Sequence, residues 1–295
     1  DEDKNKVNKK IDRIRVYDIS MIDQKFIDKH DITEVIISIQ KIKPSRLLEI
    51  TDSLIKLNVE VKIVPPLTKW IGGDLQANQI KQVNIEDLLD REQILIDNPI
   101  VQREVEGKVI LVSGAAGSIG SEISRQLSLY NCKLIVLIDQ AESPLYDLQQ
   151  ELIQKGVTNF GAIVSDVRDK FKISRIFKKY KPQRIFHAAA YKHVPLVEDN
   201  ILEGISNNII GTKNCIDISI KYNVEKFVLI STDKAVRPTN VMGTTKRICE
   251  LYAQNVNPHN TEIVAVRFGN VLGSSGSVIP KFKSQIEAGK NITVT

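Results

Sequence analysis

From Lys108 onward, short runs of apolar and β-branched residues alternate with longer segments in which apolar residues recur every three or four positions. The first pattern is typical of strands buried on both faces, and the second of helices that cover a sheet. Their alternation predicts an α/β domain with a doubly wound parallel sheet of the Rossmann type. Strands are expected at 108–114, 133–139, 160–166, 184–190, 226–232 and 262–271, and helices at 118–130, 143–155, 171–180, 208–223 and 243–255.

A smaller α/β unit precedes this domain. An apolar run at 33–39 is followed by a helical pattern at 44–58 and by a second apolar run at 59–66. Strand, helix and strand in so short a span predict a parallel pair joined by a crossover helix. The unit has few strands and no glycine-rich turn, and both chain ends suggest a fragment. We expect a partial Rossmann-like domain at 1–82, a connector at 83–107 with a short helix at 85–90, and the larger domain at 108–295.

The composition is that of an ordinary globular protein, with 42% hydrophobic and 26% charged residues. The net charge of +5 is modest and its lysines are spread over helical faces, so nucleic-acid binding is not expected. Cys132, Cys215 and Cys249 are isolated, which predicts neither a disulfide framework nor a metal site and favours a reducing, cytosolic setting. No uninterrupted apolar run approaches the roughly 18 residues of a membrane span.

The first strand of the larger domain runs into the sequence LVSGAAGSIGSE, which places Gly114, Gly117 and Gly120 between that strand and the next helix. Glycines there permit a tight turn and let the backbone approach a pyrophosphate closely. The helix N-terminus supplies free N–H groups and the positive end of the helix dipole. The following strand ends in Asp139, at the distance along the chain expected of an acidic residue that binds the adenosine ribose. The combination predicts a dinucleotide site.

Asp139 also favours NAD over NADP, because a carboxylate accepts hydrogen bonds from both ribose hydroxyls and repels a 2′-phosphate. The next residues, 140–142, offer no cation to that phosphate. Asp166, after the third strand, is placed to accept a hydrogen bond from the adenine amine, and a helix cap is the alternative. Further cofactor contacts are predicted for Ser118, Ile119, Gln140, Val167, Ala188, Ala189, Ala190 and Lys246.

Three longer motifs carry a family resemblance. They are AAAYKHVPLVEDN at 188–200, STDKAVRPTNVMGTTKR at 231–247 and RFGNVLGSSGSVIPKF at 267–282. Together with the GxxGxxG spacing, they resemble the UDP-N-acetylglucosamine 4,6-dehydratases in their long, membrane-anchored form. That group is the polysaccharide-biosynthesis branch of the extended short-chain dehydrogenase/reductase superfamily, and the resemblance covers essentially the whole chain.

The resemblance implies a degenerate Rossmann-like domain ahead of the NAD-binding catalytic domain, with UDP-N-acetylglucosamine as substrate. It also implies a homo-oligomer at the cytoplasmic face of the inner membrane, anchored by segments outside this chain. Relatives continue with a substrate-cap region, so we expect that region to be truncated here.

The implied reaction is a redox-neutral elimination. C4 of the sugar is oxidised by NAD, a base removes the C5 proton, an acid helps the C6 hydroxyl to leave as water, and the hydride returns to C6. By the same resemblance Asp233 is the acid, Lys234 is the base, and Thr232 orients the substrate. The alternative for Asp233 is a helix cap paired with Lys234. Adjacent opposite charges oppose the neutral forms that the two roles require.

Most of the superfamily has a tyrosine four residues before the lysine that holds the nicotinamide ribose. Here that lysine is Lys246, and Met242 stands in the tyrosine's place. A thioether cannot transfer a proton at any pH. Three interpretations stay open: Met242 only packs on its helix, the site is inactive, or the C4 proton leaves through Asp233, Thr232 or a water. The long-form dehydratases also carry methionine here, which favours the third.

The resemblance places further residues at the substrate. Lys192 and His193 follow the strand beside the nicotinamide, and Asn208 bonds to backbone near the site. Asn270 and Ser277 belong to a loop whose small residues let backbone amides reach a diphosphate, with an ordinary flexible loop as the alternative. His187 is expected to be a core residue, satisfied by hydrogen bonds.

Two rival functions stay open. A UDP-sugar 4-epimerase or dehydrogenase would use the same fold, but an epimerase needs no acid/base pair at C5 and C6. A non-catalytic module that binds NAD or a nucleotide sugar would suit the missing tyrosine, but not the intact pair Asp233 and Lys234.

Overall fold

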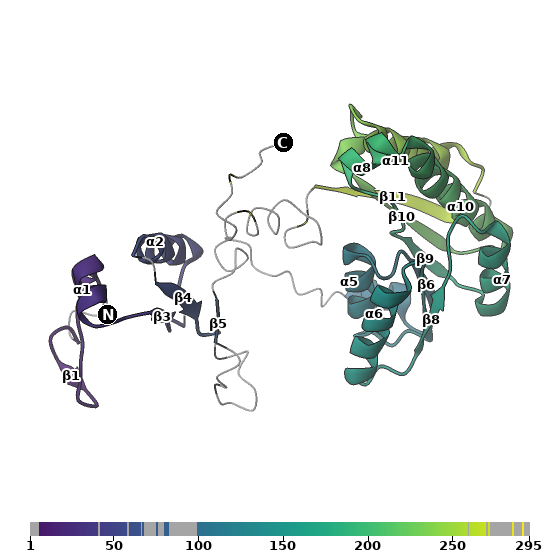
Figure 1. Ribbon diagram of the computed structural model, residues 1–295. Helices are drawn as coiled ribbons and strands as arrows, with labels where there is room; N and C mark the ends of the chain where they lie inside the picture. Colours follow the sequence, from purple (N-terminus) through teal and green to yellow (C-terminus); the bar gives the residue numbers. More distant parts are fainter. Residues whose placement is uncertain are drawn as a thin grey trace. The chain divides into compact units, whose positions relative to one another are not determined.

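The structure is a computed structural model that describes residues 6–40, 42–57, 59–65, 67, 75, 80–82, 99–258, 260–269, 271, 285 and 291. The chain divides into two compact units, 1–95 and 96–295. Figure 1 traces both along the sequence. The helix expected at 85–90, and the predicted site residues Asn270 and Ser277, lie outside the described residues.

The first unit contains the parallel pair predicted from its sequence. Strand β3 (Glu34–Ile37) pairs in parallel with β4 (Glu60–Ile63), and α2 (Pro44–Ile55) is the crossover helix between them. Proline suits the first turn of α2 because the N–H group that it lacks would have no partner there. The remaining described elements are β1 (Lys10–Ile11), β2 (Ile14–Arg15), η1 (Ile19–Met21), α1 (Gln24–Lys29) and β5 (Lys81–Gln82).

The second unit is a parallel sheet of six strands in the order β11-β10-β9-β6-β7-β8. All six coincide with predicted strands, so the expected fold class is confirmed. The order reverses between β6 and β9, which opens a crevice at the carboxyl ends of these strands. The strands are β6 (Val109–Ser113), β7 (Leu134–Asp139), β8 (Phe160–Val164), β9 (Arg184–His187), β10 (Lys226–Thr232) and β11 (Glu262–Phe268).

Helices cover both faces of this sheet (Figure 1). Leu111 of β6 packs toward α7, α10 and α11, whereas the next residue, Val112, packs toward α4, α5 and α6. Alternate side chains of a buried strand thus serve two separate cores. The helices are α4 (Pro99–Val105), α5 (Ser118–Leu127), α6 (Glu142–Gln154), α7 (Lys170–Tyr180), α10 (Gly211–Lys221) and α11 (Val241–Asn255).

Two helical segments differ from the sequence expectation. Helix α4 lies within the segment expected as a connector, and its Val105 is buried in the core of the second unit. The helix expected to begin at 208 begins earlier, because α8 (Val194–Asp199), α9 (Ile201–Gly204) and the π-helix η4 (Ile205–Ile210) run into α10. No described helix combines the length and the apolar character needed to span a membrane.

Candidate active site

The glycine-rich turn between β6 and α5 is closed in by backbone. Gly114 has φ +71°, and a Cβ there would lie 2.4 Å from the backbone nitrogen of Ala189. A Cβ on Gly120 would lie 2.0 Å from the carbonyl oxygen of Gly114. Neither position admits a side chain, so the turn presents bare backbone beside the N-terminus of α5, as pyrophosphate binding requires.

Asp139 is fixed at the end of β7 by two backbone donors. The N–H groups of Ala116 and Ala141 each donate to its carboxylate at 2.9 Å. It lines a cavity of about 230 Å³ at the crevice, which we call the adenosine cavity. The carboxylate and the bare glycine turn fit the adenosine half of NAD. Predicted cofactor residues lining this cavity are Gly114, Gly117, Asp139, Gln140, Asp166, Val167, Ala188, Ala189 and Ala190.

Asp166 lines the same cavity but does not cap a helix. Its carboxylate accepts from the backbone N–H of Arg168 and pairs with the Arg168 guanidinium at 2.7 Å. Burial raises the pKa of Asp166, but the bonds from Arg168 outweigh it and lower the pKa below its usual value. Asp169 caps α7 instead, so the alternative of a cap at Asp166 is wrong.

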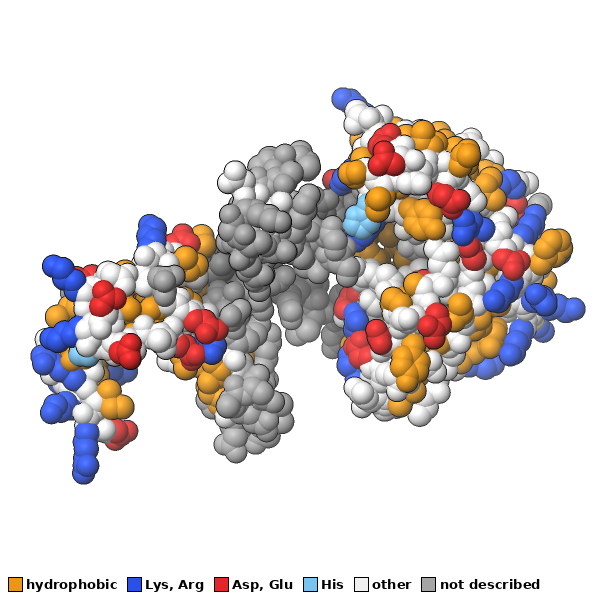
Figure 2. All heavy atoms as spheres, viewed as in Figure 1, with side chains coloured by type: hydrophobic (Ala, Val, Ile, Leu, Met, Phe, Trp, Pro, Cys, Tyr) orange, Lys and Arg blue, Asp and Glu red, His pale blue; other side chains and the backbone are white. Residues whose placement is uncertain are grey.

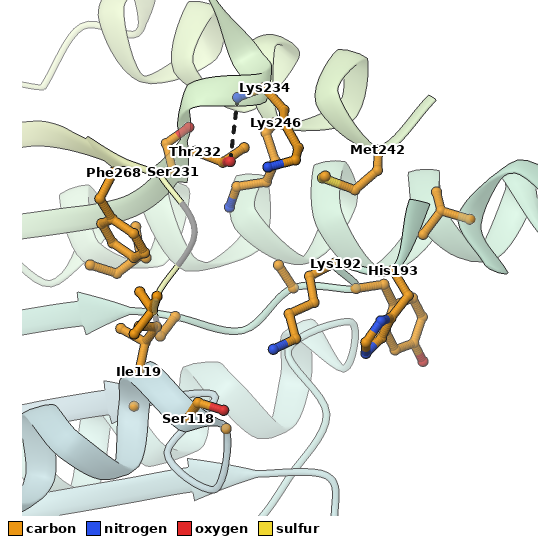
Figure 3. A pocket seen from close by; sticks show the side chains of 18 of the residues that line it. Ser118, Ile119, Lys192, His193, Ser231, Thr232, Lys234, Met242, Lys246 and Phe268 are labelled. Atoms are coloured by element: carbon orange, nitrogen blue, oxygen red, sulfur yellow. Dashed lines mark hydrogen bonds between the residues drawn. The ribbon is translucent and has the colours of Figure 1, made fainter. Parts of the chain in front are cut away.

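A second cavity, of about 760 Å³, adjoins the first and shares Gly117, Ala188, Ala190 and Tyr191 with it. We call it the sugar cavity, and Figure 3 shows its lining. It brings together the predicted residues Ser118, Ile119, Gly120, Lys192, His193, Thr232, Lys234, Met242 and Lys246. The sequence analysis did not single out the ten other lining residues, Tyr191, Leu196, Val197, Asn200, Glu203, Ile230, Ser231, Phe268, Gly269 and Val271.

The triplet Thr232–Lys234 lies where β10 ends and the short helix η5 (Asp233–Ala235) begins. The Thr232 hydroxyl donates to Asp233 at 2.9 Å, and Lys234 Nζ donates to the same carboxylate oxygen at 3.3 Å. These bonds, that from Thr232 first, lower the pKa of Asp233. Thr232, not Asp233, caps η5, so that half of the alternative for Asp233 is wrong, although its pairing with Lys234 is present.

Asp233 lies beside the sugar cavity but outside its described lining. Thr232 and Lys234 are lining residues, whereas Asp233 is not, among the residues described. Figure 3 shows the hydrogen bond that the backbone N–H of Lys234 donates to the Thr232 hydroxyl. Asp233 therefore reaches the cavity through the side chains that bond to it.

Helix α11 presents Met242 and Lys246 to the sugar cavity from one face (Figure 3). It begins after Asn240, whose side chain accepts from the backbone N–H of Gly243. A Cβ on Gly243 would lie 2.5 Å from the carbonyl oxygen of Lys234, so α11 packs directly on η5. Burial lowers the pKa of Lys246. Met242 is buried at the cavity wall and brings no titratable group there.

Asn208 bonds to backbone as predicted. Its side chain accepts from the N–H of Tyr191 at 2.8 Å and donates to the carbonyl of Tyr191 at 3.0 Å and to the Thr245 hydroxyl at 2.9 Å. It is fully buried and does not line the sugar cavity among the described residues. It holds the segment that carries Tyr191 and Lys192.

His187 is a core residue, as expected. It is fully buried, and its two ring nitrogens share hydrogen bonds with Ser113 at 2.7 Å and Thr212 at 2.9 Å. Burial, reinforced by the charge of Lys246, lowers its pKa to about 3, so the ring is neutral at physiological pH.

Glu250, also on α11, is a buried carboxylate that the sequence analysis did not single out. It is 1% exposed and accepts hydrogen bonds from Ser231 at 2.6 Å, Arg267 at 2.6 and 2.8 Å, and Arg247 at 3.1 Å. Burial raises its pKa, but the bonds from Arg267, Ser231 and Arg247 outweigh it and lower the pKa to about 2. The signal available in the sequence was its spacing, four residues beyond Lys246 on the same helix face.

This carboxylate predicts an acid-dependent loss of stability. Its folded pKa of about 2 lies below the ordinary value of 4.5, so the stabilisation is complete above pH 4.5 and is lost as pH falls toward 2. The difference corresponds to roughly 3 kcal/mol. The Tm of the unaltered protein should exceed that of Glu250→Gln near neutrality, and the gap should narrow between those two pH values. A gap independent of pH would contradict the assignment.

Comparisons with known proteins agree with this geometry. The family described as "Polysaccharide biosynthesis protein" matches residues 110–295. The capsular polysaccharide biosynthesis protein CapD of Staphylococcus aureus is 44% identical over 300 residues, covering 100% of this chain and 50% of CapD. The chain thus spans about half the length of the curated relatives that it matches over most of its length.

Other relatives match a smaller share of the chain. The UDP-N-acetylglucosamine 4,6-dehydratase (inverting) of Campylobacter jejuni is 35% identical, over 64% of this chain and 57% of that protein. The UDP-glucose 4-epimerase of Rickettsia canadensis is 34% identical, over 64% and 56%. The crystal structure of Pen from Bacillus thuringiensis has a TM-score of 0.61 at 34% identity, over 64% of this chain and 59% of that one.

The match over residues 110–295 includes the glycine turn, Asp139 and all the residues named above on β10 and α11. The chain therefore belongs to the polysaccharide biosynthesis protein family, within the extended short-chain dehydrogenase/reductase superfamily of nucleotide-sugar enzymes.

Proposed function

We propose that this chain is the NAD-dependent catalytic part of a UDP-N-acetylglucosamine 4,6-dehydratase, whose UDP-4-keto-6-deoxy product serves surface glycan or glycoprotein synthesis. The observation that carries the proposal is the pair Asp233 and Lys234 at the carboxyl end of β10, with Lys234 lining the sugar cavity. The similarity to the Campylobacter protein of that name supports it. A 4-epimerase is the second candidate, because the Rickettsia epimerase is almost as similar. A homo-oligomer at the inner membrane's cytoplasmic face, anchored by segments outside this chain, belongs to the same proposal.

The residues that would hold NAD are those of the crevice. The glycine turn and the N-terminus of α5 suit the pyrophosphate, Asp139 the adenosine ribose and Lys246 the nicotinamide ribose. When bound, NAD supplies the reversible oxidation at C4.

The proton of the C4 hydroxyl needs an acceptor that Met242 cannot provide. Thr232 lines the sugar cavity and donates its own proton to Asp233. The C4 proton therefore moves to the Thr232 oxygen while the Thr232 proton moves to Asp233. The lowered pKa of Asp233 keeps its carboxylate ionised, so the acceptor carries no proton when the reaction begins. This route answers the question raised by the missing tyrosine.

Protonated Asp233 is then the acid that the second half of the reaction requires. It returns its proton, through the Thr232 hydroxyl, to the C6 hydroxyl, which leaves as water, while the Lys234 amine takes the proton from C5. The hydrogen taken from C4 ends on C6, and Lys234 returns a proton to C5. One water leaves, and both side chains finish as they began.

The proposal is tested by identifying the product. The full-length protein is incubated with UDP-N-acetylglucosamine and NAD, and nucleotide sugars are separated and weighed by mass spectrometry. A dehydratase gives a product lighter by one water without net NADH. A product of unchanged mass that migrates as the C4 epimer would favour the epimerase, and no turnover with NAD bound would favour the binding module.

Lys234→Met is expected to lower the rate of dehydration by about 10²–10⁴-fold, the usual contribution of a general base. C4 oxidation does not need Lys234, so the variant should accumulate bound NADH, measured by its absorbance, as product formation fails. Arg237→Met is the matched control, because Arg237 is an exposed cation three positions along that lies outside the described cavity lining. Normal turnover in Lys234→Met would remove Lys234 from the mechanism.

A further inference from the structure

The carboxylate of Glu250 joins two strands and a helix at the carboxyl end of the sheet. Ser231 of β10 and Arg267 of β11 are direct partners in the parallel register, and both donate to Glu250. Arg267 does so through two nitrogens, one to each carboxylate oxygen. Such a bidentate interaction fixes the orientation of the two side chains as well as the distance between them.

The residues just beyond this junction form the wall of the sugar cavity. Thr232 and Phe268 follow Ser231 and Arg267, pair with each other in the same register, and line the cavity. Ser231 lines it too. A shift of the Glu250 carboxylate would therefore move both strand ends at the place where the sugar is expected.

The Glu250 carboxylate also fixes helix α11, which forms another wall of the sugar cavity. Met242, Lys246 and Glu250 follow one another at intervals of four residues on α11, so they share a face of the helix. Met242 and Lys246 line the sugar cavity, and Glu250 lies one turn behind them. None of the three residues that bond to Glu250 is among the described lining residues of the adenosine cavity.

We propose that Glu250 is a positioning residue for the sugar half of the site, an inference that rests on the proposed function. It touches neither cofactor nor substrate. It sets the distance between the β10 end with Thr232, the β11 end with Phe268, and the face of α11 with Lys246. Arg247 and Arg267 balance its charge, so the buried group is fully paired.

The test compares two ligands on the full-length protein. In Glu250→Gln, affinity for UDP-N-acetylglucosamine and kcat/KM should fall by about 10- to 100-fold, the scale on which small displacements act. Affinity for NAD, measured by the same calorimetry, should fall by less, because the glycine turn and Asp139 hold the adenosine half away from the partners of Glu250. Ser231→Ala removes one bond only and should shift the same quantities in the same direction by less. It keeps the inference testable if Glu250→Gln folds poorly.

Glu225→Gln is the matched control. Glu225 is also a carboxylate bound to several donors, Lys108, Arg184 and Gln183, but it precedes β10 and so lies at the amino end of that strand, away from the site. The Glu225→Gln variant should have a lower Tm and the same kcat/KM as the unaltered protein. A purely structural role for Glu250 would give the same result in both variants, or would weaken NAD binding and sugar binding to the same extent, and either outcome would overturn the inference.

Failure of the proposed function and failure of the inference about Glu250 would give different results. If the unaltered protein binds UDP-N-acetylglucosamine but never dehydrates it, the proposed function has failed, and the binding comparison still decides the role of Glu250. If it dehydrates the sugar and Glu250→Gln does so equally well, only the inference has failed.

Discussion

Replacing Asp233 with asparagine is expected to lower kcat for dehydration by about 10²–10⁴-fold and to prevent bound NADH from accumulating. The amide that replaces the carboxylate cannot take up the proton that Thr232 passes on from the C4 hydroxyl. Oxidation at C4 and loss of water from C6 therefore fail together. Rapid-mixing absorbance of bound NADH, with product analysis on the same samples, measures both steps.

The contrast with Lys234→Met makes this result specific. Lys234 acts after C4 oxidation and Asp233 acts during it, so NADH should accumulate in the lysine variant and not in the asparagine variant. Asp199→Asn is the control, since Asp199 is an exposed carboxylate on α8 outside the described cavity lining. If NADH forms in Asp233→Asn at the normal rate, the C4 proton leaves by another route.

Gly120→Ala is expected to weaken NAD binding by about 100-fold or more, which corresponds to about 2.7 kcal/mol. The added methyl would lie 2.0 Å from the carbonyl oxygen of Gly114 and 2.8 Å from the Cα of Ala115, both of them backbone atoms. Backbone cannot swing aside as a side chain can, so the turn itself must shift away from the pyrophosphate. Overpacking of this kind also destabilises a fold by roughly 1–3 kcal/mol, so Tm should fall.

Gly161→Ala separates the local effect from the general effect of adding a methyl group. Gly161 lies within β8, and a Cβ there meets no atom within 4 Å. Calorimetric titration with NAD should give an unchanged dissociation constant for this variant. Unimpaired NAD binding by Gly120→Ala would show that the glycine turn does not cradle the cofactor.

The sheet could be predicted from the sequence because its strands are buried on both faces. Continuous apolar runs such as 134–138 have no other simple interpretation, and all six were placed correctly. The segment 194–210 could not be read the same way. Its helices are short, and the π-helix η4 interrupts the 3.6-residue period by which a helix is recognised in a sequence.

The candidate site was predictable where it depends on position along a strand or helix. Thr232 ends a strand, Lys234 follows it, and Met242 and Lys246 share a helix face, so their convergence at the carboxyl end of the sheet could be expected. Glu250 depends instead on the register of β10 with β11, which places Ser231 beside Arg267. Hydrogen bonds between elements, such as that from Ser231 to Glu250, are likewise invisible in a sequence.

The central claim is that Lys234 removes the C5 proton in a redox-neutral dehydration despite methionine at position 242. It is tested most directly by converting UDP-N-acetylglucosamine with the full-length protein in deuterated water and weighing the product. The account predicts loss of one water and gain of one solvent deuteron on carbon at C5, with the C4 hydrogen retained at C6. A product of unchanged mass, or one that has lost water without gaining deuterium, would contradict it.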